Sequence, residues 1–499
     1  MGTFEEKDKA AGPAKVPASA WKVLAVLSSI ATMVMYAETM LIPAIPDLIR
    51  EFNVSYGMSS WILTAYLIPG AVMTPIAGKL SDIYGKKKVL LIILAIYIVG
   101  LAIAGFSSSI YMLFLARSIQ GIGMAMFVIA FGIIRDQFPR EKLSIGQGVI
   151  SSMFASGAVI GLVAGGVIIT SYGWHATFFT TIPIAVLLFV VILRFNYDRG
   201  QSGEKKSEKN QAAEHIVPKI IDYKGAVALA ILVTSFLIAL TMMETGNDRS
   251  TAVTIALFVG AGTAALVSFI IVERRARAPI IDFKLVSHAA ILPSNLIIMI
   301  VGFSMFMVFQ TIPVLVRNPE PLGFGGNAAM AGYVQLPFAI VLLVFGPTAG
   351  FIVQKLGSVR PIILGTIVTT AGFGFLLAFH NDAVSVAASL GVLSTGLSLT
   401  NVGALNVTLL ATPIQFTGMS LGMNTLLRIV GSSVGPALAG VYMQMFQSSI
   451  MVKGMSTSYP SVQAYDSIFL TAVILSIVSV ALAIHLRIRL GKLSIPNLR

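Results

Sequence analysis

The sequence predicts an all-α polytopic membrane protein with fourteen membrane-spanning helices, and two observations lead to this fold class. The 499-residue chain is 56% hydrophobic and 11% charged, with a mean hydropathy of +0.88, whereas soluble domains carry about a quarter charged residues. Its apolar residues also gather in runs of the length that a helix needs, about 20 residues, to cross a hydrocarbon core roughly 30 Å thick. These runs are rich in Ala, Leu, Gly and Ile, which favours helices over the alternating strands of a membrane barrel.

The predicted spans form two groups of six, separated by a polar insert and two further spans. The first six are expected near residues 22–45, 58–80, 88–106, 110–134, 145–170 and 175–194. The seventh and eighth are expected near 225–243 and 251–272. The last six are expected near 291–314, 329–354, 360–380, 383–411, 416–446 and 465–486.

These spans divide the chain into seven predicted parts. They are an N-terminal tail (1–21), a six-helix bundle (22–194), a linker (195–224), two additional spans (225–272), a loop (273–290), a second six-helix bundle (291–486) and a C-terminal tail (487–499). The first twenty residues are polar and lack the apolar core of a removable signal peptide, so the first span is expected to direct insertion.

Lysine and arginine predict the orientation, because loops on the cytoplasmic side of a membrane retain positive charge. Of the 34 basic residues, 28 fall in the two tails and the loops on their side. The opposite side holds only Arg50, Arg249, Arg317 and Lys453. We therefore expect a multi-pass protein of the cell membrane with both termini in the cytoplasm, and we attribute the net charge of +13 to topology.

An internal repeat relates the two six-span groups. The matched pairs, at offsets of 272 or 274 positions, are Gly78–Gly350, Gly85–Gly357, Gly157–Gly431 and Gly161–Gly435. Gln310 also follows Glu38 by 272 positions, which indicates equivalent places in the two halves. Repeated halves are a transporter architecture in which substrate binds between them near the bilayer midplane.

Several motifs resemble those of the major facilitator superfamily, and within it the fourteen-helix drug:proton antiporters. Gly78 to Lys88 resembles the superfamily's motif A, and Arg117 to Gly123 is similar to motif B. Span five resembles the antiporter motif C, with Leu162 where proline is usual. Asp222 to Gly225 and Glu273 to Pro279 flank the two middle spans as in the fourteen-helix group. The resemblance implies a major facilitator fold, with two six-helix bundles plus two extra central helices.

The motif A loop is predicted to be a conformational latch formed by Gly78, Asp82, Gly85 and Lys86. A tight turn between spans two and three needs Gly85. The Asp82 carboxylate can accept hydrogen bonds from amides at a helix end or pair with a basic side chain. The alternative is a short charged turn that only obeys the distribution of positive charge.

Glu38 is the only acidic residue in the interior of a predicted span, since Asp466 stands at the edge of the last one. A charge near the bilayer centre costs about 3 kcal/mol on insertion scales, and such residues usually face a cavity. We predict that Glu38 serves proton coupling by exchanging a proton for a cationic substrate. The alternative is a permanently protonated glutamic acid bonded to a neighbouring helix. Relatives often carry aspartate at the position of Ala37, so Glu38 is displaced by about 100° around the helix.

Arg117, in span four, is the second residue predicted to serve proton coupling, since the motif B arginine is associated with proton transfer in the family. A guanidinium can lower the pKa of a nearby carboxylate. The alternative is structural, with Arg117 capping backbone carbonyls between packed helices.

Two further groups of side chains are predicted to shape the site. The residues expected to line a substrate cavity are Tyr36, Gln120, Met124, Gln310 and Asn424. The residues expected to allow close helix packing or a kink are Gly157, Gly161, Gly435 and Pro436, and plain packing is the alternative for span five.

The sequence as a whole predicts a proton-coupled secondary transporter of the multidrug efflux type, which exports hydrophobic or cationic compounds by alternating access. Its expected partners are a small-molecule substrate, protons and membrane lipid, with no nucleic acid, no obligate protein partner, no cofactor and no metal. The sequence lacks a phosphate-binding loop and cysteine, and its spans carry almost no catalytic groups, so neither an ATP-driven pump nor an enzyme is expected.

Two alternatives stay open. The first is a facilitator or importer of a metabolite or organic anion, in which Arg117 or Arg428 binds the anion. The second is a non-transporting membrane sensor on the same scaffold.

Overall fold

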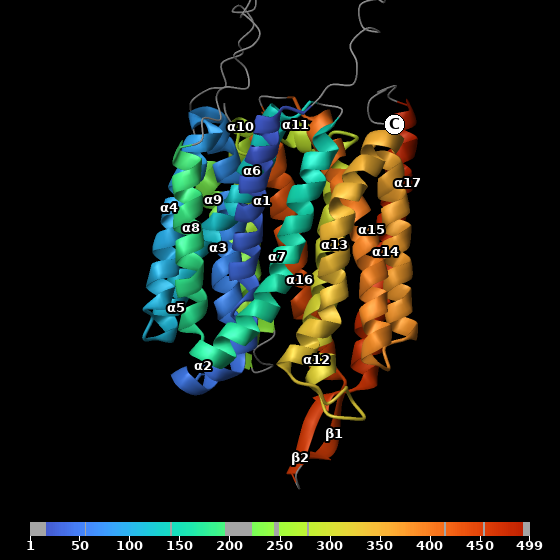
Figure 1. Cartoon of the computed structure of the whole chain (residues 1–499). Helices are drawn as coiled ribbons and strands as arrows, with labels where there is room; N and C mark the ends of the chain where they lie inside the picture. Colours follow the sequence, from blue (N-terminus) through green and yellow to red (C-terminus); the bar gives the residue numbers. More distant parts are fainter. Residues whose placement is uncertain are drawn as a thin grey trace, which may run out of the picture.

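The predicted fourteen spans are confirmed. The computed structural model describes residues 16–54, 56–139, 142–194, 222–243, 249–276, 279–413, 416–452 and 455–492. Within them are fourteen helices long and apolar enough to cross a membrane. They run side by side, and the start of α1 and the end of α17 both lie at one end of the molecule, the top of Figure 1. We call this end the terminus side.

The first bundle contains α1 (Ala18–Thr39), α3 (Tyr56–Tyr84), α4 (Lys86–Gly105), α5 (Ile110–Gly121), η2 (Ile122–Ala125), α6 (Met126–Gln137), α7 (Leu143–Tyr172) and α8 (His175–Arg194). Span four is thus built from α5 and α6 joined by one 3₁₀ turn. The short elements η1 (Ile42–Ala44) and α2 (Ile45–Phe52) connect α1 to α3.

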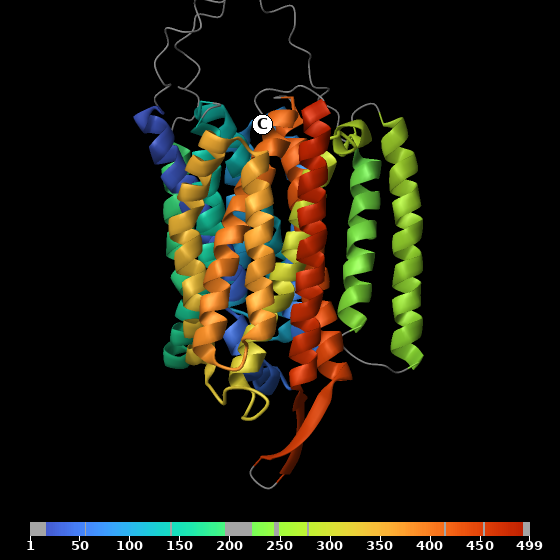
Figure 2. The same ribbon diagram turned by 90° about the vertical axis from the view of Figure 1, so that its right-hand side faces the viewer.

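The second bundle contains α12 (Ile291–Arg317), α13 (Ala328–Leu356), α14 (Val359–Ala378), α15 (Ala383–Ala411), α16 (Thr417–Met445) and α17 (Val462–Lys492). The two middle spans are α9 (Tyr223–Met243) and α10 (Arg249–Arg275), and α11 (Phe283–Val286) follows them. Figure 2 shows α9 and α10 standing as a green pair at one edge of the bundle. These two helices lie between the two bundles in the sequence, but they stand beside the bundles in the structure.

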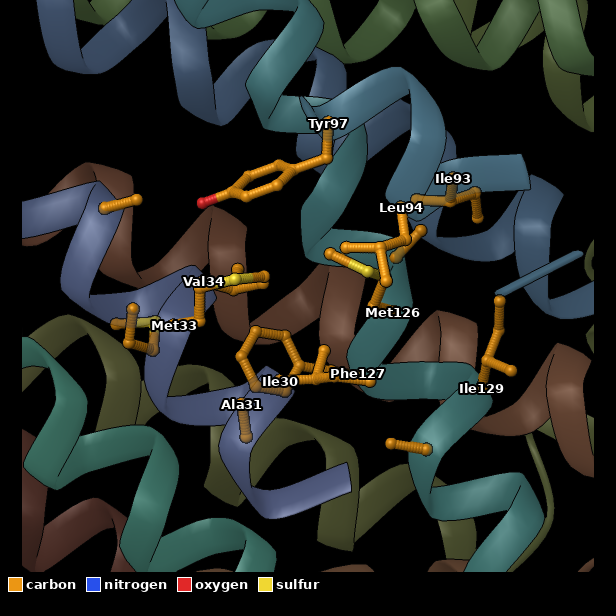
Figure 3. Packing of buried hydrophobic residues seen from close by; sticks show 14 of the residues in the cluster. Ile30, Ala31, Met33, Val34, Ile93, Leu94, Tyr97, Met126, Phe127 and Ile129 are labelled. Carbon is orange, nitrogen blue, oxygen red and sulfur yellow. The ribbon is translucent and has the colours of Figure 1, made fainter. Parts of the chain in front are cut away.

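Each bundle has its own hydrophobic core. In the first, Ile30 and Val34 of α1 pack with Leu94 of α4 and Phe127 of α6 (Figure 3). A separate cluster of α12 to α17 contains Ile312, Phe373 and Phe469. The surface is apolar where it would meet lipid; α10, for example, exposes Leu257 and Val267. The two cores and the apolar exterior fit two bundles that pack separately within a bilayer.

The predicted internal repeat recurs in the packing. In the first bundle, Gly157 and Gly161 of α7 lie against the backbone of α1 at Thr32 and Tyr36. In the second, Gly431 and Gly435 of α16 lie against Met299 and Phe303 of α12 in the same way. Small residues let the two helix backbones of each pair approach closely. For span five (α7), these contacts agree with the alternative interpretation, in which its glycines serve close helix packing. The glycines of α16 make the same kind of contact.

This packing corrects one predicted equivalence. The α12 contacts lie 267 positions after the α1 contacts, so the place of Glu38 in the second bundle belongs to Met305 rather than Gln310. The sequence offset of 272 came from Gly78 and Gly350 in the next spans, and the stretch from Tyr36 to Gly78 is five residues shorter than the stretch from Phe303 to Gly350. An offset measured in one part of a repeat therefore does not carry over to another.

A two-stranded hairpin departs from the all-helical expectation. Strands β1 (Gln447–Val452) and β2 (Met455–Pro460) pair antiparallel, with Gln447 opposite Pro460. The hairpin projects from the end opposite the termini, which we call the hairpin side (Figure 1). Thr457 and Tyr459 of β2 are residue types that favour strands, and the predicted spans left this short segment in a loop.

The glycine contacts predict that a large side chain at Gly157 destabilises the protein. A Cβ at this position would lie 2.6 Å from the Thr32 carbonyl oxygen, which belongs to rigid helix backbone. Gly157→Leu should therefore cost at least the ~1–3 kcal/mol of an overpacked core and lower the melting temperature in detergent. Gly260→Leu, at a site with no atom within 4 Å, is the matched control. Equal melting temperatures for the two variants would contradict the packing assigned to Gly157.

Candidate functional site

A cavity of about 850 Å³ lies between the two bundles. Its walls come from α1, α3 and α7 of the first bundle, from α12 and α16 of the second, and from α9. It extends to the hairpin side, because the ends of both strands contribute to its lining at Gln447 and Tyr459. The middle spans therefore form part of the cavity wall, through Leu237 and Leu240 of α9, which the sequence reading missed.

Glu38 lines this cavity and is its only acidic side chain among the described lining residues. It is 5% exposed, and its Oε2 atom has no hydrogen-bond partner among the described residues. Ala37, the position at which the family resemblance implies an aspartate, is fully buried in the first bundle's core. The displacement by one position thus moves the acid from the core side of α1 to its cavity side. A buried carboxylate without a partner is unfavourable, so a bound proton or cation would stabilise it.

The backbone at Glu38 is held where α1 ends. The last carbonyls of a helix lack partners within it, and Pro43 has no N–H to offer the Thr39 carbonyl. The Arg117 guanidinium supplies hydrogen-bond donors to two other carbonyls of this last turn. It donates to the oxygen of Ala37 at 2.7 Å and to that of Glu38 at 3.1 Å. The carboxylate of Glu38 is left facing the cavity.

Arg117 is fully buried and its other contacts are also structural. Its guanidinium donates to the side-chain oxygen of Gln120 at 3.1 Å and to the carbonyl of Ile62 at 3.4 Å, and it lies 4.5 Å from the ring centre of Tyr66. It thus makes the contacts of the alternative reading, a guanidinium that caps carbonyls between helices. It also lies near enough to attract a charge on Glu38, as does Arg428.

The predicted cavity residues divide into two groups. Gln310 lines the large cavity. Asn424 lines a second, smaller cavity of about 80 Å³ and donates to Asn295 at 2.8 Å. The remaining three line neither of these cavities: Tyr36 lies beside Thr180 of α8, Gln120 donates to the carbonyl of Gly100, and Met124 packs against Gly70 in a buried cluster. Whether a residue lines a cavity depends on the face of the helix on which it lies. The hydrophobic length of a span does not predict that face.

Arg428 also lines the smaller cavity. Its guanidinium lies 4.4 Å from the ring centre of Phe154, a cation–π contact across the two bundles. Phe306 lines both cavities, so the two are neighbours along α12. Pro436, predicted as a kink, lies inside α16 and lines the large cavity.

The predicted latch residues meet the second bundle on the terminus side. The Asp82 carboxylate accepts from the backbone N–H of Gly418 at 2.9 Å, in the first turn of α16. An anion at a helix N-terminus is favourable because the free N–H groups and the helix dipole both attract it. Gly78 and Gly418 pack backbone to backbone at the same crossing, where no larger residue fits.

The rest of the latch lies within the first bundle. Gly85 adopts a φ of +92°, a conformation that favours glycine, so the short turn into α4 depends on it. Lys86 pairs with Asp136 of α6 at 2.6 Å. Arg135, which the sequence reading did not single out, reaches the second bundle instead, donating to the Thr412 carbonyl at 2.7 Å and to the Thr417 hydroxyl.

The connection between α10 and α12 also bridges the two bundles on the terminus side. Lys79 of α3 donates to the carbonyl of Pro279 at 2.8 Å, and Glu273 accepts from the N–H of Ile281 at 2.5 Å. The next residue, Asp282, approaches the sulfur of Met419 in α16 with its N–H. Residues 279–282, which we call the strap, therefore contact α3, α10 and α16 together.

Two six-helix bundles around a cavity that reaches one end and is closed at the other define a membrane transport protein. A family model described as Major Facilitator Superfamily matches residues 27–316, more than half of the chain. The chain belongs to the Major Facilitator Superfamily and is a multi-pass membrane transporter, which confirms the predicted family and fold class.

Several similar proteins carry names that refer to drugs. "Multidrug resistance protein 3" of Bacillus subtilis (strain 168) is 27% identical over 437 residues, covering 86% of this chain and 80% of that protein. "Tetracenomycin C resistance and export protein" of Streptomyces glaucescens is 25% identical over 450 residues, covering 88% and 80%. The crystal structure of the human organic anion transporter MFSD10 (TETRAN) matches 94% of this chain and 100% of its own, with a TM-score of 0.63 at 15% identity, and so shares the fold.

The terminus-side contacts predict that Asp82→Asn loosens the closure. The variant loses the negative charge that the α16 N-terminus attracts. Because the chain has no cysteine, Ile145→Cys provides a single buried reporter beside Gly350 of the opposite bundle. Maleimide should label it several-fold faster in Asp82→Asn. Glu320→Gln, at an exposed acid in the connection between α12 and α13, should leave the rate unchanged; faster labelling in this control as well would refute a specific role for Asp82.

Proposed function

We propose that this transporter exports hydrophobic or cationic compounds in exchange for protons, as a multidrug efflux protein. The observation that carries the proposal is the buried Glu38 carboxyl in the large cavity, with one oxygen that has no partner among the described residues. A single acid that binds either a proton or a cation, in turn, is sufficient for exchange. The drug-related names of the relatives support the same substrate class.

The cavity suits such compounds in size and lining. Its volume of about 850 Å³ lies at the upper end of ordinary small-molecule sites. Twelve of its 23 lining residues are leucine, phenylalanine, proline, isoleucine or valine, which favours the apolar body of a ligand.

The anion facilitator is less well supported, because both arginines it invokes are already in contact with other groups. Arg117 is fully buried and donates to four oxygen atoms. Arg428 faces an aromatic ring in a cavity of about 80 Å³, too small for most organic anions. For the sensor alternative, no observation stands in its favour.

We also propose that the termini face the cytoplasm, so the cavity as described opens to the outside. In this orientation the Asp82 contact to α16 is a latch that holds the cytoplasmic side closed and breaks when the transporter turns inward. Arg117 then acts as a positioning residue: it fixes the backbone of Glu38, and its charge attracts the ionised carboxylate.

The proposal predicts that Glu38→Gln abolishes proton exchange, because the amide cannot bind or release a proton. The protein is reconstituted in vesicles with an interior pH dye, and a lipophilic monovalent cation is added across an imposed proton gradient. Wild type should move protons in response to the cation, whereas Glu38→Gln should fall to the level of vesicles without protein. Glu320→Gln, the same change at an exposed residue outside the cavity lining, is the matched control. Undiminished exchange in Glu38→Gln would remove this residue from the mechanism.

A further inference from the structure

The large cavity carries a second charge that the proposed exchange does not use. Among the described lining residues Glu38 is the only acid and Arg317 the only base. Arg317 belongs to the last turn of α12, on the hairpin side. Its side chain is exposed and has no hydrogen bond or ion pair to another described residue. Arg317 therefore has a free guanidinium at the mouth of the cavity that contains Glu38.

The two charges lie at different depths. Gln310, which lines the body of the cavity, precedes Arg317 by seven residues in α12. At about 1.5 Å per residue, this places the arginine roughly 10 Å further out along the helix. Glu38 is 95% buried, whereas Arg317 is exposed, so the acid occupies the inner end and the base the outer end.

The wall between these ends is mainly apolar, with Thr64 and Gln310 as polar exceptions. Phe306, Phe309 and Pro313 of α12 form one side of it, and Leu63 and Leu67 of α3 form another. Leu237 and Leu240 of α9 complete this part of the lining. From the inside outward, the lining of the cavity thus consists of a carboxyl group, a mainly apolar segment and a guanidinium.

We propose that the cavity is a two-charge site for amphiphilic zwitterions, in which Glu38 receives the cationic group of the ligand and Arg317 its carboxylate. The inference rests on the proposed function, since it assumes that Glu38 exchanges a cation for a proton. A carboxylate suits Arg317 because a free guanidinium binds it with two parallel hydrogen bonds. A ligand with a cation alone uses the inner end of the site and leaves Arg317 unpaired.

Two dyes that differ by one carboxylate test this assignment. Tetramethylrhodamine has a cationic chromophore and a free carboxylate, and its methyl ester is a cation of nearly the same shape. Uptake of each is measured in vesicles that contain wild type, Arg317→Gln, Arg317→Lys or Glu38→Gln. Arg360→Gln, at an exposed arginine of α14 on the terminus side, is the matched control.

The expected result is specific to one dye and one variant. Wild type should transport both dyes, and Arg317→Gln should raise the KM for the free acid by about fivefold, the scale of one exposed ion pair, while the KM for the ester stays unchanged or falls. Arg317→Lys should recover part of the loss, because the charge returns without the bidentate geometry. Arg360→Gln should behave as wild type with both dyes.

The outcomes that would contradict the expected result also show which of the two proposals fails. If wild type transports the ester and not the free acid, the two-charge site is wrong and the cation exporter stands. If Arg317→Gln impairs both dyes equally, Arg317 only supports the end of α12 and is no ligand group. If neither dye moves, or if both move equally well in Glu38→Gln, the proposed function itself fails.

Discussion

The contact between Arg117 and the end of α1 is the interaction on which the cavity depends. Inside a bilayer every backbone polar group needs a partner within the protein, and Ala37 and Glu38 lie in the last turn of α1, where helix carbonyls lack intrahelical partners. Arg117 satisfies both of them. The helix can therefore end inside the first bundle, and the chain can turn through η1 while the Glu38 side chain remains at the cavity surface. Without these bonds the turn would expose polar backbone to the hydrophobic core.

On the terminus side the two bundles are joined by few directional bonds and by close backbone contact. Asp82 binds Gly418, Arg135 binds the Thr412 carbonyl, and the Ser144 hydroxyl donates to Gly350 at 2.8 Å. These bonds end on backbone atoms or hydroxyls at the ends of helices. Water and other helix ends can replace them at small cost, which suits an interface that separates in one state and forms in another. The strap adds contacts to the same interface from the connection that follows α10.

Sequence reasoning predicted the spans and the family, because these depend on local patterns: hydrophobic length and motifs such as the Gly78 to Lys88 loop. It also selected Glu38, since an isolated acid stands out in an apolar run. It did not predict which face of a helix meets the cavity. Gln120 and Met124 are polar or soft residues in a spanning helix, as expected of a lining, yet they bond to Gly100 and pack on Gly70 inside the first bundle. Helix rotation is set by packing against neighbours, such as the α1–α7 glycine contacts, and no single-helix pattern contains that information.

The same limit explains why α9 and Arg317 escaped notice. Two spans inserted between repeated halves carry no sequence signal that they line a cavity. An arginine at a helix end is expected from the helix dipole alone. The fold gives both a different setting: α9 fills the gap beside α3 and α16, and the last turn of α12 reaches the mouth of the cavity. Positive charge is scarce on the hairpin side, where the sequence reading places only four basic residues. A guanidinium in that position, at an opening whose inner end carries the only acid among the described lining residues, gives the cavity an electrostatic direction. A ligand with both charges can align with that direction, whereas a simple cation meets repulsion at the mouth and attraction further in.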